Sequence, residues 1–256
     1  MVIKQLSCVF RLKDSCTNRL LTSSEAIFWC SGRVVRHEYK TGGYFVLTDM
    51  PEGEYIITVT AVGCQRENVP VTVRYDGSSA MDRVIFLSLN PSPSHPYAGR
   101  YPSVCGKAEG CSEIYALSPG GILRVAEDKA AAGADSVRMF AEGKNPVLPS
   151  DFLLGSGSKA ELVTFTDAQS GLYRTRQPIK NAHKRSEPAQ PLIKLQCGED
   201  GSFFLLMGGT FSADKQTGKI PLTFAAERGG KLVTASVEVE PVRFADVGTL
   251  DFTGGK

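Results

Sequence analysis

The chain has 256 residues, of which 42% are hydrophobic, and this is enough for two globular domains with cores of their own. Its 29 basic and 27 acidic residues leave a net charge of +2, which gives no reason to expect nucleic acid or an anionic membrane as a partner. The seven cysteines are odd in number and scattered, so they do not form a disulfide framework.

The N-terminal segment lacks the uninterrupted apolar stretch of a secretory signal, because Lys4, Gln5 and Arg11 interrupt it. No run of residues has the length and apolarity of a membrane span. We therefore expect no signal peptide and no membrane insertion, synthesis in the cytoplasm, and cysteines that are mostly reduced thiols. For Cys105 and Cys111, free thiols are favoured over a local disulfide. A zinc knuckle is least favoured, because no second cysteine pair completes four ligands.

Short runs rich in β-branched and aromatic residues alternate with turn residues over the first 90 positions. These runs lie at 6–12, 26–30, 33–40, 43–47, 55–61, 69–73 and 84–89. A spacing of roughly 8 to 12 residues between short strands is typical of a β-sandwich. We therefore predict an all-β protein whose first domain, residues 1–89, is an antiparallel Greek-key sandwich.

The stretch 40–63 resembles the carboxypeptidase regulatory-like domain, also called prealbumin-like or transthyretin-like. The matching residues are Gly43, Phe45, Met50, Pro51, Gly53, Tyr55, Ala61 and Gly63. Met50 stands where the family has Leu, and Cys64 stands where it has Tyr or Phe. The resemblance covers residues 1–90 and implies a fold rather than an activity, because the zinc carboxypeptidase domain that gives the family its name is absent.

The residues of this stretch also favour two strands joined by a turn, as in a β-hairpin, on physical grounds. Pro51 presets φ at the turn, and Gly53 supplies a positive φ. Because strand side chains alternate between faces, Phe45 and Tyr55 each begin a row that can point into the core. We predict that these two aromatic residues anchor the first domain.

Residues 90–102 contain four prolines in thirteen positions, which suits neither a sheet ladder nor a helix. We predict a semi-rigid extended linker and a domain boundary here. Tyr97, Arg100 and Tyr101 lie in this segment without a strand of their own, and Tyr and Arg are frequent interface anchors. We therefore predict that these three residues bind a protein partner; the alternative is that the rings pack on the adjoining domains of the same chain.

The remainder divides into a small mixed or hairpin-rich segment at 103–157 and a second β-sandwich at 158–256. In the first, 122–125 resembles a strand, whereas 126–132 has helical propensity that Gly133 interrupts. In the second, strand-like runs lie at 162–166, 192–195, 203–207, 220–225, 232–239 and 249–252. Residues 159–254 resemble a diverged second copy of the first domain. The Pro-x-Gly-x-Tyr turn is missing, so a sandwich of another type is the alternative.

No catalytic constellation emerges from the sequence. The three histidines lie in different segments and are expected to be solvated, and no nucleophile elbow, zinc-protease motif or nucleotide-binding loop is present. Asp49, Glu52 and Glu54 crowd one turn, where a solvated acidic turn is favoured over a cation site. We therefore expect no enzyme activity, no metal and no cofactor.

These observations favour a non-enzymatic structural or adaptor subunit of a larger assembly, whose partners are other protein subunits or copies of itself. A component of a phage-tail-like or contractile particle fits by analogy, because such particles assemble in the cytoplasm. The alternative is a carbohydrate- or peptide-binding surface module. An enzyme with a site split between domains is the least favoured hypothesis.

Overall fold

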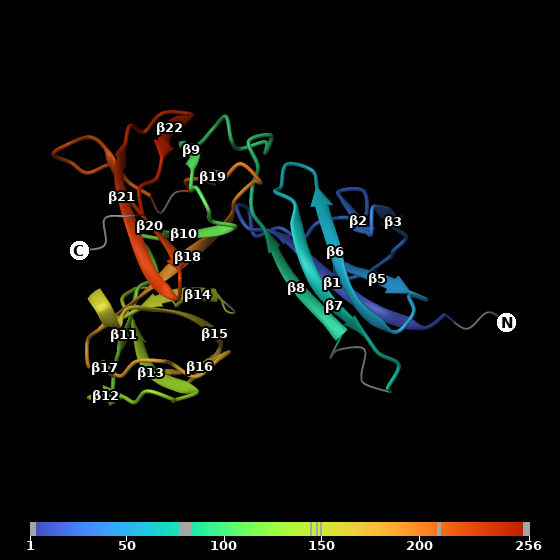
Figure 1. Cartoon of the computed structure of the whole chain (residues 1–256), viewed down its shortest axis with the longest axis horizontal. Coiled ribbons are helices and arrows are strands. Elements are labelled where there is room, and N and C mark those ends of the chain that lie inside the picture. The colour runs from blue at the N-terminus through green and yellow to red at the C-terminus, as the bar shows by residue number, and fades with distance from the viewer. Residues whose placement is uncertain are drawn as a thin grey trace. The chain divides into compact units, whose positions relative to one another are not determined.

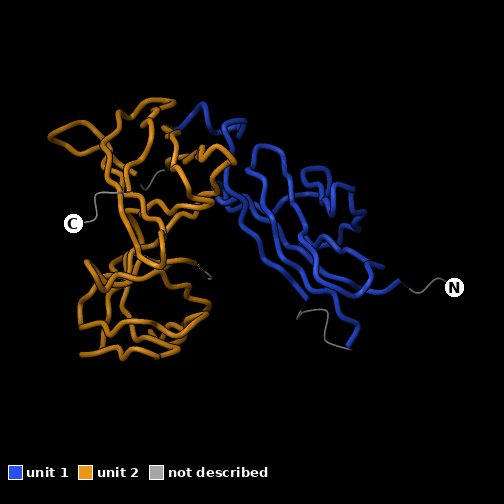
Figure 2. Tube along the Cα trace, viewed as in Figure 1, with its two compact units in different colours: residues 1–101 blue, residues 102–256 orange. Residues whose placement is uncertain are grey.

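The computed structural model describes residues 4–76, 83–143, 145–146, 148, 150–208 and 211–252, and its regular structure is almost entirely β-strand (Figure 1). This confirms the all-β fold class. Two compact units divide the chain, Met1–Tyr101 and Pro102–Lys256 (Figure 2). η2 (Gly157–Lys159) is a short helical turn, and no helix among the described residues is long and apolar enough to cross a membrane.

The first unit is a β-sandwich of two sheets, with strand orders β4-β5-β1-β8 and β3-β2-β6-β7. Its strands are β1 (Leu6–Asp14), β2 (Ala26–Cys30), β3 (Arg33–Val35), β4 (Glu38–Lys40), β5 (Tyr44–Thr48), β6 (Gly53–Ala61), β7 (Glu67–Val73) and β8 (Val84–Leu89). Phe10 and Phe45 point inward from one sheet and meet Phe28 of the other, with ring centroids 5.1 and 5.4 Å apart. This aromatic contact joins the two sheets through a single core.

The expected hairpin is wrong, because β5 and β6 lie in different sheets and do not pair; the turn between them carries the chain from one sheet to the other. The chemistry of this turn is nevertheless the one expected from the sequence. Gly53 has a φ of 154°, and the Tyr55 hydroxyl donates a hydrogen bond to the Pro51 carbonyl at 2.9 Å. Phe45 is fully buried, whereas Tyr55 is half-buried at the edge of the same core. One pairing departs from the antiparallel expectation: β8, the last strand of the sandwich, runs parallel to β1.

The second unit contains two separate hydrophobic cores. Its strands are β9 (Ser103–Lys107), β10 (Glu113–Leu117), β11 (Leu123–Val125), β12 (Lys129–Ala130), β13 (Ser136–Ala141), β14 (Ser150–Leu154), β15 (Glu161–Gln169), β16 (Leu172–Thr175), β17 (His183–Lys184), β18 (Pro188–Gln196), β19 (Ser202–Leu206), β20 (Ile220–Arg228), β21 (Lys231–Val239) and β22 (Ala245–Thr249). One core draws its buried residues from 104–116 and 195–252, and the other draws them from 123–189.

The first of these cores belongs to a second sandwich. The sheet β19-β9-β22 packs on β10, β20, β21 and the end of β18, and Phe203 meets Phe224 across the core at 5.2 Å between centroids. β10 and β18 pair antiparallel up to Leu117 and Leu192. The second sandwich is therefore built from two distant parts of the sequence, and residues 118–191 are inserted into one of its hairpins.

The inserted module, residues 118–191, closes on itself. Its sheet runs β11-β13-β16-β15-β14-β18, and β18 pairs again with β11 to complete the ring. Phe152 and Phe165 fill the centre, with ring centroids 5.1 Å apart. β18 passes from this ring into the second sandwich, because Ala189 lies in one core and Leu195 in the other.

This architecture corrects three sequence-based expectations for the second unit. No boundary lies at residue 157, because β14 and β15 pair across it. The helical propensity of 126–132 is overridden by pairing of β12 with β17. A contiguous second copy at 159–254 is also wrong, because residues before 191 belong to the inserted module whereas β9 and β10 complete the sandwich.

Candidate interaction surface

The proline-rich segment after β8 is folded back onto the first sandwich rather than extended. His95 and Ala98 N–H groups donate to the Ser92 and His95 carbonyls at 2.9 Å each, which defines successive turns. The Ser92 N–H donates to the Gly63 carbonyl at 2.8 Å. The expectation of an extended spacer was wrong, because its prolines stand in turns whose remaining backbone groups bond to the sandwich. The unit boundary falls after Tyr101.

A buried side-chain pair fixes this segment in place. The His95 Nε2 lies 3.2 Å from Asp14 Oδ2, and both side chains are almost fully buried. The Tyr97 N–H donates to His95 Nδ1 at 3.2 Å, so the ring proton sits on Nε2 and is donated to Asp14. Burial acts to raise the pKa of Asp14, but hydrogen bonds from Thr17, the Cys16 N–H and His95 outweigh it and hold that pKa below its ordinary value.

Tyr97, Arg100 and Tyr101 come together beside this anchor, and we call them the tyrosine cluster. The two tyrosine rings lie 5.7 Å apart, and the Arg100 guanidinium carbon lies 5.7 Å from the Tyr97 ring centroid. Tyr97 also packs on the His95 ring, with 5.6 Å between the ring centroids, so part of its surface is already in contact within the chain. Tyr101 remains 44% exposed. The cluster therefore presents aromatic and cationic surface on a backbone that is already ordered.

The acidic turn does not converge on a cation position. Asp49 Oδ1 accepts the Gln5 N–H at 2.9 Å, and Glu52 Oε1 accepts the Tyr75 N–H at 2.6 Å. Glu54 is exposed. Among the described residues, no group of three histidine, cysteine or acidic side chains is arranged to hold a metal ion.

The histidines correct another expectation, because His95 and His183 are buried rather than solvated. His183 Nε2 lies 2.9 Å from Glu161 Oε1, and Nδ1 lies 2.8 Å from Glu187 Oε2. The ring packs so closely on Gly155, whose φ is +81°, that a Cβ there would approach His183 Cε1 to 2.6 Å. Both ring nitrogens are occupied in each of these histidines, so neither offers a free nitrogen for proton transfer.

No disulfide joins any of the seven cysteines, all of which lie in the described part of the chain. Cys105 donates to the Ala245 carbonyl at 3.7 Å rather than bonding to Cys111. Cys8 is the most deeply buried, and burial raises the pKa of its thiol to about 12. Cys8 therefore behaves as a small core residue rather than as a nucleophile.

Sequence reasoning found the tyrosine cluster but missed its anchor. Asp14 and His95 are 81 positions apart, and Glu161 and His183 are 22 apart, so no local spacing signals either pair. The proline-rich composition indicated where the cluster lies. Only the fold shows that the segment is tied to the end of β1.

Comparison with known proteins gives no family for this chain. No family model matches the sequence, and no curated protein matches it either. Among solved structures, a chimeric titin Z1Z2-Z1Z2 tandem functionalised with a GRGDS peptide from fibronectin aligns over 93% of this chain and 96% of its own, at 11% identity and a TM-score of 0.15. A TM-score this low carries no argument about fold or function.

Proposed function

We propose that this protein is a non-enzymatic structural or adaptor subunit of a larger protein assembly, of the kind found in phage-tail-like contractile particles. The observation that carries the proposal is the tyrosine cluster, where Tyr101 is exposed beside Arg100 and Tyr97 on a segment held by the buried Asp14–His95 pair. Tyr and Arg side chains that are ordered before binding lose little conformational entropy when a partner docks.

The surroundings of the buried histidines support a structural role. Each ring has both nitrogens engaged by carboxylate or backbone groups, which removes the commonest general base from consideration at those positions. The three separate cores, two of them sharing the strand β18, also suit a modular structural protein.

The finer fold assignment of the first sandwich belongs to the same proposal. We infer a carboxypeptidase regulatory-like domain from the connection between β5 and β6, where Pro51 lies in the turn and Gly53 and Tyr55 begin β6. The burial of Phe45, Ile57 and Val59 on the inner faces of these strands supports this inference.

The test is the double variant Tyr97→Ala/Tyr101→Ala, purified from its native source under the same conditions as the wild type. We expect the assembly to be lost while the isolated chain melts as before, because Tyr101 is exposed and Tyr97 is only partly buried. The matched control is Tyr97→Phe/Tyr101→Phe, which keeps both rings and should keep the assembly. The isolated alanine variant could instead melt at a lower temperature than the wild type and lose assembly only where it unfolds. That result would mean that the two rings stabilise the chain itself and do not contact a partner.

A second candidate, a carbohydrate-binding surface module, has one observation in its favour. On the outer face of the first sandwich, the Arg11 guanidinium carbon lies 5.3 Å from the Tyr44 ring and 6.0 Å from the Phe86 ring. Phe86 is 60% exposed, and exposed aromatic rings stack on apolar faces of ligands. Binding to a panel of immobilised glycans that Phe86→Ala abolishes would favour this candidate over the first.

A further inference from the structure

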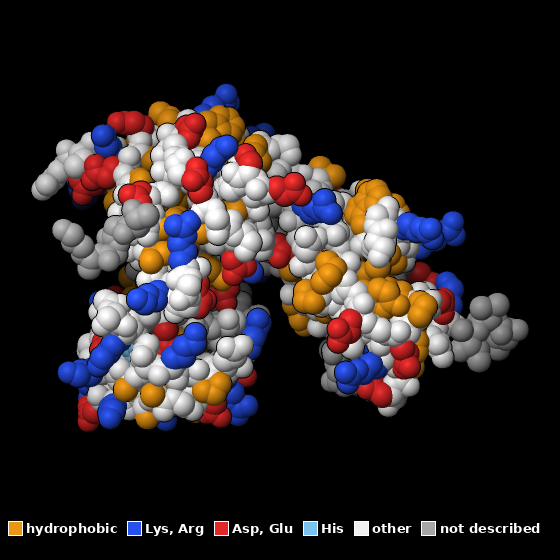
Figure 3. Space-filling view, viewed as in Figure 1, with side chains coloured by type: hydrophobic (Ala, Val, Ile, Leu, Met, Phe, Trp, Pro, Cys, Tyr) orange, Lys and Arg blue, Asp and Glu red, His pale blue; other side chains and the backbone are white. Residues whose placement is uncertain are grey.

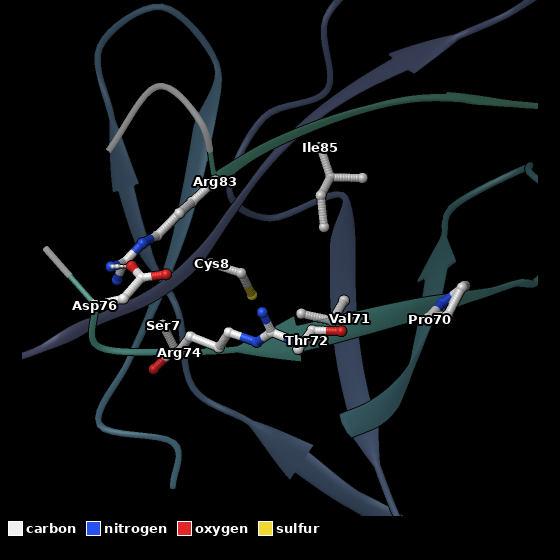
Figure 4. Close-up of a pocket in the computed structure, with 9 residues that line it drawn as sticks. All are labelled: Ser7, Cys8, Pro70, Val71, Thr72, Arg74, Asp76, Arg83 and Ile85. Atoms are coloured by element: carbon white, nitrogen blue, oxygen red, sulfur yellow. Dashed lines mark ion pairs between the residues drawn. The ribbon is translucent and has the colours of Figure 1, made fainter. Parts of the chain in front are cut away.

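Each of the two sandwiches leaves one side open. In the first, β8 ends one sheet and β7 ends the other, and an open groove of about 430 Å³ lies between the sheets (Figure 4). In the second, β21 and β22 end the two sheets and border a groove of about 440 Å³. The outer strand of a sheet carries backbone N–H and C=O groups that can pair with another chain.

The described lining of the first groove mixes polar and apolar side chains, and its charged members, Arg74, Arg83 and Asp76, leave a net positive charge. Cys8, Val71 and Ile85 line it from β1, β7 and β8. Arg83 and Asp76 lie side by side at one end, 3.6 Å apart, and offset each other's charge (Figure 4). Arg74 also lines the groove, is exposed, and has no ion-pair partner among the described residues.

Of the two strands that border this groove, β8 lacks the usual protection of a sheet edge. Proteins ordinarily place charges, prolines or bulges on such strands to prevent pairing with other chains. β7 carries Pro70, but β8 contains neither a charged residue nor a proline, and its Phe86 is exposed. Hydrophobic side chains gather on the face of the first unit that Figure 3 shows. This edge therefore suits burial against another protein.

The groove of the second sandwich has more apolar than charged lining residues and carries the opposite charge. Valines at 237, 239 and 247 line it, and Val242 stands 47% exposed at its border. Its charged lining residues are Glu238, Glu240 and Asp246, and no basic side chain lines it. Lys219, which does not line the groove, lies 3.9 Å from Glu240 and can offset only one of the three acidic charges. The groove therefore keeps a net negative charge.

We propose that these two open edges bind each other between copies of the chain, with the β7–β8 edge of one copy against the β21–β22 edge of the next. Docking would cover both grooves and bring Arg74 towards Glu238 and Glu240. Pairing of either edge with itself would instead bring like charges together, which is unfavourable. Because the two edges differ, the contact is head-to-tail, and such contacts build rings or filaments. The inference rests on the proposed function and names the partner as a second copy.

Sedimentation velocity on the purified full chain, over a concentration series at low and high salt, tests this contact. We expect wild-type self-association that weakens with salt. Arg74→Glu and Glu238→Lys should each weaken association at least tenfold, because each reverses the charge of one edge. An equimolar mixture of the two variants should associate again, since one retains the intact acidic edge and the other the intact basic edge. Lys129→Glu and Asp167→Lys, exposed in the inserted module, are the matched controls.

Three results would overturn the inference. A wild-type chain that stays monomeric at every concentration would exclude self-association; if the native complex is nevertheless large, the proposed function stands and the partner is a different protein. Loss of association in Arg74→Glu alone would indicate that the first edge binds itself. Association unchanged in both variants, with unchanged melting curves, would place the contact elsewhere on the chain.

Discussion

At the scale of single residues, Phe45 carries much of the stability of the first sandwich. Its fully buried ring contacts Phe28 at 5.4 Å and Tyr39 at 5.1 Å between centroids. Truncating such a ring costs about 3 to 5 kcal/mol, a large part of the roughly 5 to 15 kcal/mol that stabilises a typical domain. We expect Phe45→Ala to unfold the first unit near room temperature. The fluorescence of Trp29, the chain's single tryptophan, measures this unit selectively. The control Phe86→Ala removes an exposed ring and should change the midpoint of the unfolding transition little. Equal shifts of this midpoint in the two variants would contradict the assignment of Phe45 to the inner face of the sandwich.

Asp14 makes the first unit sensitive to acid. Hydrogen bonds to the carboxylate hold its pKa below the ordinary value, so its ionised form stabilises the folded state. This contribution is complete above the ordinary Asp pKa of about 4 and is lost as the pH falls through the lowered folded-state value. We expect Asp14→Asn to be less stable than the wild type at pH 7 and to lose less further stability on acidification. Parallel pH profiles for the two proteins, followed by Trp29 fluorescence, would show that Asp14 has no such role.

At the scale of elements, local patterns predicted strands better than they predicted their partners. β5, β6 and the turn between them were predictable because Pro51, Gly53 and the alternating apolar residues act within a few positions of one another. Their placement in opposite sheets, rather than in one hairpin, was not. The inserted module was not, because pairing of β10 with β18 joins residues separated by 75 or more positions. The buried histidines escaped prediction for the same reason. The tyrosine cluster was located by composition, but its attachment to Asp14 depends on the fold.

The insertion gives a test of this element arrangement. Because Leu117 and Leu192 are paired neighbours, replacing residues 118–191 by Asn-Gly should close β10 and β18 into a two-residue hairpin. No buried residue of the second-sandwich core lies in the deleted segment. We expect the shortened chain to keep a cooperative second unfolding transition, measured by far-ultraviolet circular dichroism beside the Trp29 signal. Loss of that transition, while a matched full-length control keeps it, would mean that the inserted module and the sandwich fold as one.

At the scale of the whole molecule, the chain is a series of β modules, each with its own core, and its exposed features are suited to contacts with protein. The tyrosine cluster lies on the first unit, and open sheet edges of opposite charge occur on both sandwiches. Neither feature encloses a small molecule, and the buried ionisable pairs are engaged in holding loops to strands. The proposed assembly role would account for these features together.

Size-exclusion chromatography with light scattering, on material purified under native conditions, tests this account most directly. We predict a particle whose mass is well above that of a single 256-residue chain, and which the Tyr97→Ala/Tyr101→Ala variant fails to form. A folded, natively purified protein that elutes with the mass of one chain at every concentration would contradict the assembly role.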